Sequence, residues 1–212
     1  MADERNARSR APDDDGSRVF AAEAAYADSI FRTALGDVDG SIAALEASLR
    51  LKPDYAPALL SLGSVEYQRS NPEEGKRLFT SLPSLPEDTP DLCEIIGEAG
   101  GFLIQIGENG DGLDLFRAGA RRFPEAAELF EGIGCCAGHE GLHSEAIEAC
   151  ERALELAPDG QRHVNNLGWS LLGAGRREEA RKVLERAVAM DPDDEIARNN
   201  LRTCLEELDR AR

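Results

Sequence analysis

Apolar residues recur at intervals of three and four along most of the chain, the spacing that places them on one face of a helix. One such segment carries Ala180, Val183, Leu184, Ala187 and Val188, and the segment before it carries Val164, Leu167, Leu171 and Leu172. Gly175 stands between the two, where the first helix should end, because glycine readily adopts the left-handed conformation of a helix end. Pro192 ends the second segment, since proline lacks an amide donor. The pattern predicts a helical hairpin.

The hairpin pattern returns with a period of 34 residues. Residues 127–160 and 161–194 carry the same residue types in register: Ile133-Gly134 matches Leu167-Gly168, Gly141 matches Gly175, Ala146 matches Ala180 and Ala153 matches Ala187. The frame also fits residues 93–126 and 22–55, and residues 56–89 are a weaker copy without the late proline. A single hairpin cannot bury both of its apolar faces, so the five units are expected to stack.

The two ends of the chain differ from the repeats. Residues 195–212 begin like a sixth unit and stop after one helix, which we expect to be a polar capping helix that covers the fifth hairpin through Ile196, Leu201, Leu205 and Leu208. Residues 1–18 are rich in Asp, Arg, Ala and Ser and carry almost nothing apolar, which predicts a disordered N-terminal arm. The predicted solenoid therefore spans residues 19–212.

A proline-rich junction interrupts the period between the second and third units. Pro83, Pro86 and Pro90 follow one another closely, and three residues in excess of the period are inserted there. We expect a hinged or shifted contact between hairpins at residues 83–92. The alternative is a break into two domains, which is disfavoured because the same period resumes beyond the junction.

The repeated units resemble those of the tetratricopeptide-repeat family, and the resemblance covers roughly residues 22–212. The family signature has Leu-Gly and an aromatic residue on the first helix and Ala and Pro on the second, and it stands here as Asn165-Asn166-Leu167-Gly168-Trp169, Glu179-Ala180 and Pro192. The unit at 22–55 departs most, with Asp28-Ser29 in place of Leu-Gly. The resemblance implies an all-α solenoid of about five hairpins, a right-handed superhelix whose concave side is lined by the first helix of each hairpin.

The same geometry implies which side chains face the concave groove. The predicted partner-binding residues are Tyr67, Glu94, Glu98, Glu128, Glu131, Arg162, Asn165, Asn166, Trp169, Asn199 and Asn200. The middle of this set is acidic, and its C-terminal end is rich in amides, which can donate and accept hydrogen bonds along a peptide main chain. As alternatives, the asparagines simply follow the repeat consensus, and Trp169 packs between repeats instead of anchoring a partner's apolar side chain.

Charge is unevenly distributed along the chain. The 212 residues carry a formal net charge of −17. Residues 161–212 hold ten basic and ten acidic side chains, whereas residues 1–160 hold 31 acidic and 14 basic ones. Such a surface repels phosphates, which excludes nucleic acid as a partner and favours a basic or amphipathic protein segment. The alternative is that the acidity only keeps a helical array soluble.

Composition also bears on the location of the protein. No run of eighteen apolar residues exists, so no membrane span is predicted. The first five residues, Met1 to Arg5, lack the apolar core of a secretory signal, which predicts a cytoplasmic protein. Only Lys52, Lys76 and Lys182 among the 24 basic residues are lysine, a bias that suggests a GC-rich bacterial genome.

Cys135, His139 and His143 are the strongest candidates for chemistry. Cys135 and His139 lie four residues apart on one expected helix face, which suits two zinc ligands, with His143 in the following turn as a third. However, no paired C-x-x-C accompanies them, and the other cysteines at Cys136, Cys150 and Cys204 occupy small-residue packing positions of the repeats. The sequence therefore predicts no metal, no cofactor and no enzymatic activity.

These observations together predict a non-enzymatic adaptor whose concave groove holds a helix or an extended segment of another protein. Acidic peptide tails, which one subclass of the family clamps, are excluded because the four glutamates of the groove would repel them. Two alternatives stay open. One is an assembly scaffold that associates with itself as a homo-oligomer. The other is a chaperone of a secreted or assembling subunit, whose basic segment would lie along the acidic middle of the groove.

Overall fold

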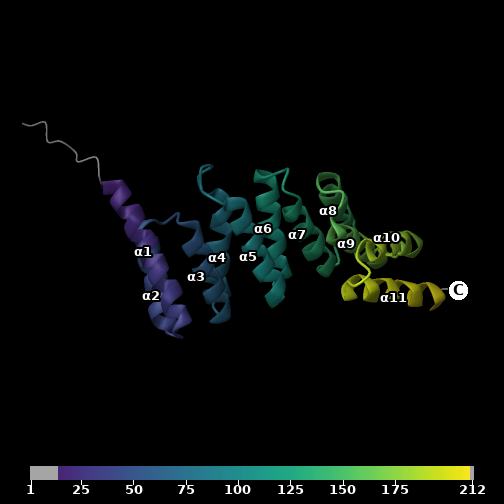
Figure 1. The fold of residues 1–212 in the computed structure, drawn as a ribbon, viewed down its shortest axis with the longest axis horizontal. Coiled ribbons are helices and arrows are strands. Elements are labelled where there is room, and N and C mark those ends of the chain that lie inside the picture. The colour runs from purple at the N-terminus through teal and green to yellow at the C-terminus, as the bar shows by residue number, and fades with distance from the viewer. Residues whose placement is uncertain (1–13, 211–212) are drawn as a thin grey trace, which may run out of the picture. The chain divides into compact units, whose positions relative to one another are not determined.

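The structure of the protein, a computed structural model, describes residues 14–210. All of its regular elements are helical, which confirms the predicted all-α fold class. The helices, shown in Figure 1, are α1 (Asp14–Ala34), α2 (Val38–Leu51), α3 (Ala56–Gln68), α4 (Pro72–Ser81), the short 3-10 helix η1 (Leu82–Ser84), α5 (Leu92–Ile106), α6 (Asn109–Arg122), α7 (Ala127–His139), α8 (His143–Leu156), α9 (Gln161–Gly173), α10 (Arg177–Met190) and α11 (Glu195–Arg210).

Consecutive helices pair into hairpins. Contacts join α1 to α2, α5 to α6, α7 to α8 and α9 to α10, and α3 meets α4 where the Tyr67 ring lies against Gly75. Three of the expected repeat units begin at the first residue of a helix, at Ala56 for α3, Ala127 for α7 and Gln161 for α9. The periodicity therefore located the starts of these helices correctly.

Residues with positive φ separate the two helices within each hairpin. Gly36, Gly107, Gly141 and Gly175 have φ between 74° and 83°, and Ser70 takes the same place with φ 63° in the weaker unit. Glycine adopts this left-handed conformation without the steric penalty that a Cβ imposes. The expected helix end at Gly175 is thus confirmed, and the same device recurs in the other repeats.

The chain divides into two compact parts, an N-terminal part up to Leu78 and a C-terminal part from Phe79. The division falls within α4, a few residues before the predicted junction at 83–92. Residues just after α4 are attached to the C-terminal part, because the Arg122 guanidinium on α6 donates hydrogen bonds to the carbonyls of Pro83, at 2.8 Å, and Leu85. A hinge at residues 83–92 stays a prediction.

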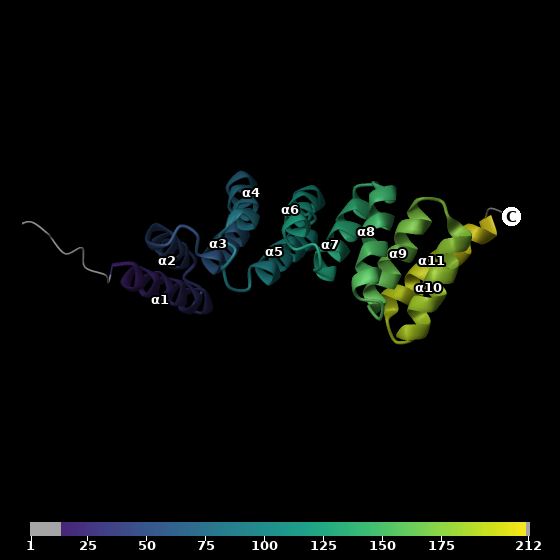
Figure 2. The same ribbon diagram turned by 90° about the horizontal axis from the view of Figure 1, so that it is seen from above.

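Successive hairpins stack within the C-terminal part (Figures 1 and 2). The second helix of one hairpin packs on the first helix of the next, as α6 does on α7 and α8 on α9. The first helices also touch one another, α5 with α7, α7 with α9 and α9 with α11. These contacts bring the first helices together on one side of the stack, which is the arrangement of an α-solenoid.

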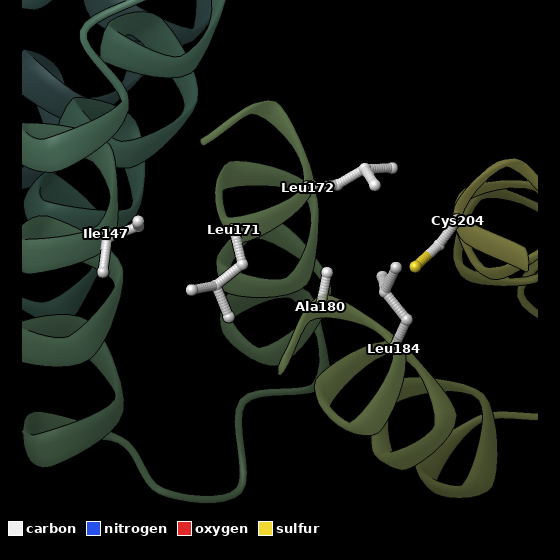
Figure 3. Packing of buried hydrophobic residues seen from close by; sticks show 6 residues of the cluster. All are labelled: Ile147, Leu171, Leu172, Ala180, Leu184 and Cys204. Carbon is white, nitrogen blue, oxygen red and sulfur yellow. The ribbon is translucent and has the colours of Figure 1, made fainter. Parts of the chain in front are cut away.

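The capping helix α11 covers the fifth hairpin through Leu201 and Leu208, as expected, but not through Ile196 and Leu205. Ala197 and Cys204 are fully buried, and Leu201 and Leu208 pack against the same core as Cys204, which Figure 3 shows facing Leu172 and Leu184. Ile196 and Leu205, which were predicted to be buried, are 66% and 42% exposed. The small side chains at 197 and 204 let α11 approach closely, and this rotates the two larger residues away from the core.

The N-terminal helix starts earlier than expected. α1 begins at Asp14, so residues 14–18 of the predicted disordered arm are helical. Extending an existing helix by a turn is favourable because each added residue gains a backbone hydrogen bond without a new nucleation step. Residues 1–13 of the predicted arm lie outside the described residues. No helix between residues 14 and 210 has the length and apolar character needed to cross a bilayer, and the cytoplasmic location stays a prediction.

Candidate functional site

A groove of about 1150 Å³ runs along the first helices of the C-terminal part. Residues of α5, α7 and α9 make up most of its lining, and the connection between α10 and α11 and the start of α11 supply three more residues. The lining residues are Cys93, Glu94, Gly97, Glu98, Gly101, Ile104, Phe116, Glu128, Glu131, Gly132, Cys135, Gln161, Arg162, Asn165, Asn166, Asp191, Asp194 and Ile196. The groove therefore follows the first helices of successive hairpins, the helices that the family resemblance predicts to line it.

The Phe116 ring forms part of the groove floor, although it comes from α6, a second helix. It lies between Gly100 of α5 and Gly132 of α7, since a Cβ at either glycine would collide with ring atoms. Phe116 is only 3% exposed. Two glycines on neighbouring helices thus make room for one aromatic ring, and Ile104 adds a second apolar side chain to the lining.

Gly97 and Gly101 also line the groove, but unlike Gly100 and Gly132 they do not make room for a buried side chain. A Cβ at Gly97 or Gly101 would meet no atom of the described residues within 4 Å apart from its own stretch of helix, so packing against other elements does not require glycine there. Each glycine lowers helix stability by about 1 kcal/mol relative to alanine. Their effect is to leave open space along the groove face of α5.

The groove is strongly acidic. Among the described residues its lining holds six carboxylates and one guanidinium, that of Arg162. Arg162 is bound to Glu131, with Nε 3.1 Å from Oε1, and Nδ1 of the buried His163 lies 3.0 Å from Oε2 of the same glutamate, an ion pair when the imidazole is protonated. Glu94, Glu98 and Glu128 have no ion pair within residues 14–210. The four predicted glutamates are therefore not equivalent.

Amide side chains gather at the C-terminal end of the groove. Asn165 is 6% exposed and its Oδ1 accepts a hydrogen bond from Nδ2 of Asn200 at 3.1 Å. Gln161 donates to Asp194 at 2.7 Å, and Asp194 in turn accepts the backbone N–H of Ile196 at the start of α11. The Gln161 hydrogen bond, with help from backbone amides, lowers the pKa of Asp194 below its ordinary value. This carboxylate stays ionised and caps α11.

The cysteines are poor nucleophiles. Burial raises the pKa of the groove residues Cys93 and Cys135 above the ordinary value, and nearby Glu128 and Glu131 add to the effect. Burial raises the pKa of Cys136 and Cys150 further, to about 12. All four thiols are therefore protonated at neutral pH, whereas the thiolate is the reactive form.

The candidate metal ligands do not form a site. No group of three or more His, Cys, Asp or Glu side chains within the described part of the chain is placed to hold a metal ion. Cys135 and His139 lie on α7, whereas the His143 ring at the start of α8 packs against Gly173 of α9. The helical spacing of the first two residues does not bring the third into a shared coordination sphere.

Seven of the eleven predicted partner-binding residues line the groove, namely Glu94, Glu98, Glu128, Glu131, Arg162, Asn165 and Asn166. Tyr67 does not contribute a free surface, because its ring is buried against Gly75 in the N-terminal part. Trp169 and Asn199 are exposed outside the lining, and Asn200 acts through its bond to Asn165. Whether any of these residues binds a partner stays a prediction.

Sequence reasoning missed other lining residues. Phe116 belongs to a second helix, and Asp191, Asp194 and Ile196 belong to the connection between α10 and α11 and to the start of α11. Gly100 and Gly132, which flank Phe116, are the sequence feature that could have indicated the position of the ring, because glycine inside a helix indicates close approach of another group. Only the structure shows that both glycines make room for the same Phe116 ring.

The chain belongs to the tetratricopeptide-repeat family. One model described as a tetratricopeptide repeat matches residues 139–210, and a second with the same description matches residues 33–75 and 103–160. The family predicted from the sequence is thus confirmed. The repeat fold is that of a protein–protein interaction module.

The chain is similar to several proteins outside these family models. It is 27% identical over 149 residues to Protein FlbA of Caulobacter vibrioides, over 70% of this chain and 24% of FlbA, so it spans about a quarter of that protein's length. The crystal structure of MamA superposes with a TM-score of 0.60 at 23% identity, covering 81% of this chain and 92% of MamA. YrrB, described as a TPR protein with an unusual peptide-binding site, superposes with a TM-score of 0.60 at 19% identity, covering 82% and 89%. The two structural similarities show the fold alone.

Proposed function

We propose that the protein is a non-enzymatic adaptor that holds a basic or amphipathic segment of another protein in the groove of its C-terminal part. The observation that carries the proposal is the groove itself, which follows the first helices of consecutive hairpins. Its volume of about 1150 Å³ exceeds the roughly 300–1000 Å³ that suits small-molecule sites. A polypeptide segment is the ligand that suits such a long and open site.

The chemistry of the groove supports the stated character of the segment. An apolar floor that includes Phe116 and Ile104 lies beside an excess of carboxylates, which complements a segment with both apolar and basic side chains. Asn166 lines the groove and is half-buried, so it is placed to bind a peptide main chain.

Site-specific photo-cross-linking tests the proposal. A photoreactive amino acid replaces Asn166 in the groove, and a matched variant carries it at Glu148, an exposed residue on α8 outside the lining. In cells that make the protein, we expect the groove variant to cross-link to one segment of another protein, identified by mass spectrometry, and the α8 variant to miss it. Equal cross-linking from both positions, or from α8 alone, would contradict the proposal.

Substitutions in the groove then separate two roles once the cross-linked segment is known. Replacing Glu94, Glu98 and Glu128 by glutamine should slow association and reduce its salt dependence, because these charges steer the encounter. Replacing Asn166 by alanine should speed dissociation, because a polar group of the bound main chain is left desolvated without a partner. Stopped-flow measurements at two salt concentrations resolve the two effects.

A second candidate function is self-association, which an exposed apolar surface on the N-terminal part favours. Phe20, Ile30, Phe31, Leu35 and Val38 are each more than half exposed. Phe20 and Phe31 lie eleven residues apart on α1, which places them on one face of that helix. Light scattering tests this function: association that rises with concentration and is lost on Phe20→Glu and Phe31→Glu would support it, and a monomer at every concentration would reject it.

A further inference from the structure

We propose that the acidic end of the groove, formed by α5 and α7, is a site for an arginine side chain of the bound segment. The site consists of Glu94, Gly97, Glu98 and Gly101 on α5, Glu128 on α7 and the Phe116 ring below them. This proposal rests on the proposed function and deepens it, since it states which side chain the adaptor recognises and where.

Charge complementarity is the first argument. Glu131, the fourth glutamate of the groove, is already bound by Arg162 and contacted by His163. Glu94, Glu98 and Glu128 are exposed and have no ion pair among the residues described. Three neighbouring carboxylates repel one another, and a cation placed among them relieves the repulsion.

The open glycines are the second argument. Residues 94, 97, 98 and 101 follow the three-and-four spacing of one helix face, so both glycines stand beside both glutamates. Gly100 is required by the Phe116 ring, whereas a Cβ at Gly97 or Gly101 would meet no described residue within 4 Å beyond its own stretch of α5. Glycine at these two positions weakens α5 and keeps free the volume next to the carboxylates.

The floor suits a long side chain with a charged end. The half-buried Ile104 offers apolar contact to the methylene groups of an arginine, and the Phe116 ring, only 3% exposed, closes the bottom of the site, while the guanidinium can reach the glutamates. Arginine fits this arrangement better than lysine, because its planar head has five donors and binds several carboxylate oxygens at once, and it is more weakly hydrated.

An amide side chain elsewhere in the same groove suits the main chain of a bound segment. Asn165 lines the same groove and is more than nine-tenths buried. Its Oδ1 accepts the hydrogen bond from Asn200, and within residues 14–210 no hydrogen bond from its Nδ2 is found. An amide donor on so buried a side chain is suited to a carbonyl of the bound segment.

The test uses capped single residues and the full chain. The 15N-labelled protein is titrated with N-acetyl-arginine methylamide, N-acetyl-lysine methylamide and N-acetyl-norleucine methylamide, and amide chemical shifts are followed by NMR. We expect saturable shifts at Gly97 and Gly101 with the arginine compound, at least threefold weaker binding of the lysine compound, and no saturation with the norleucine compound.

Matched variants locate the site. The triple variant Glu94→Gln, Glu98→Gln, Glu128→Gln should weaken binding of the arginine compound at least tenfold. The control Glu148→Gln, Glu151→Gln, Glu155→Gln makes the same change in net charge on exposed positions of α8 and should leave it unchanged. Gly101→Leu should abolish binding by filling the open space, while circular dichroism shows an intact fold.

Other outcomes overturn the assignment. Equal binding of the lysine or norleucine compound, binding that survives the α5 and α7 triple variant, or shifts that avoid Gly97 and Gly101 would each do so. Cross-linking of a partner segment at position 166 without arginine binding would leave the proposed function standing and remove the arginine site. Arginine binding without any cross-linked segment would instead remove the proposed function.

Discussion

Asn200 of the capping helix donates a hydrogen bond of 3.1 Å to the side-chain oxygen of Asn165 in the groove. The two residues stand about one repeat apart in the chain, on α9 and α11, helices that also pack directly on each other. The bond satisfies the acceptor of a buried amide and holds its nitrogen in one orientation. The capping helix thus positions a groove residue in addition to covering the core.

Replacing Asn200 by alanine should reduce the free energy of unfolding by about 1 kcal/mol, because the oxygen of the buried Asn165 loses the donor that Asn200 supplies. Urea denaturation followed by circular dichroism measures the change. Asn199→Ala is the control, since Asn199 is exposed at the next position of the same helix. Equal effects of the two substitutions would show that the bond contributes nothing.

Neighbouring glycines on α5 should respond in opposite directions to alanine. Gly101→Ala should raise the free energy of unfolding by about 1 kcal/mol, because the added Cβ meets open space and alanine favours the helix. Gly100→Ala should lower it by about 1–3 kcal/mol, because the same atom would collide with Phe116. Thermal and urea denaturation of the two variants checks both signs, and a stabilised Gly100→Ala would contradict the placement of the ring.

Removing the capping helix should expose the core of the fifth hairpin. Truncation after Asp194 uncovers Leu172 and Leu184, so we expect aggregation or a lower melting temperature. Two adjacent point variants give a finer test. Cys204→Glu should destabilise by at least about 2 kcal/mol because it buries a charge, whereas Leu205→Glu, at a 42% exposed position, should be nearly neutral. A larger loss of stability for Leu205→Glu than for Cys204→Glu would reject the buried face assigned to α11.

A salt bridge between α6 and α8 should make stability depend on pH. Arg117 donates to both oxygens of Glu145, at 2.7 and 2.5 Å, and these bonds lower the pKa of Glu145 below its ordinary value. A carboxylate with a lowered pKa in the folded state stabilises the fold above its unfolded pKa, about 4.3, and loses that contribution as the pH falls through the folded value.

Glu145→Gln should therefore destabilise by no more than about 1 kcal/mol at pH 7, since the pair is partly exposed. The difference from the unmodified protein should shrink as the pH falls below 4, which urea denaturation at several pH values measures. Glu148→Gln, on an exposed position of the same helix, should show no such dependence. A difference that is constant from pH 7 to pH 3 would contradict the assignment.

Much of the candidate site could be predicted from the repeat, and its electrostatics could not. The period placed Glu94, Glu98, Glu128 and Glu131 at related positions of first helices, and all four line the groove. Only the structure shows that Arg162 binds Glu131 and leaves the other three without an ion pair among the described residues. Pairing depends on side chains of different repeats that come within a few ångströms, and spacing in the sequence does not encode that distance.

The sequence by itself determined the helical hairpins, their order and the glycines that separate their helices, because these follow from local backbone preferences and from a period that every repeat shares. The left-handed glycines at 36, 107, 141 and 175 are such a case. Tertiary structure alone decided that Phe116 forms part of the groove floor and that Ala197 and Cys204, instead of Ile196 and Leu205, face the core. Helix rotation and close approach are set by the packing of neighbouring helices, in which small residues matter as much as large apolar ones.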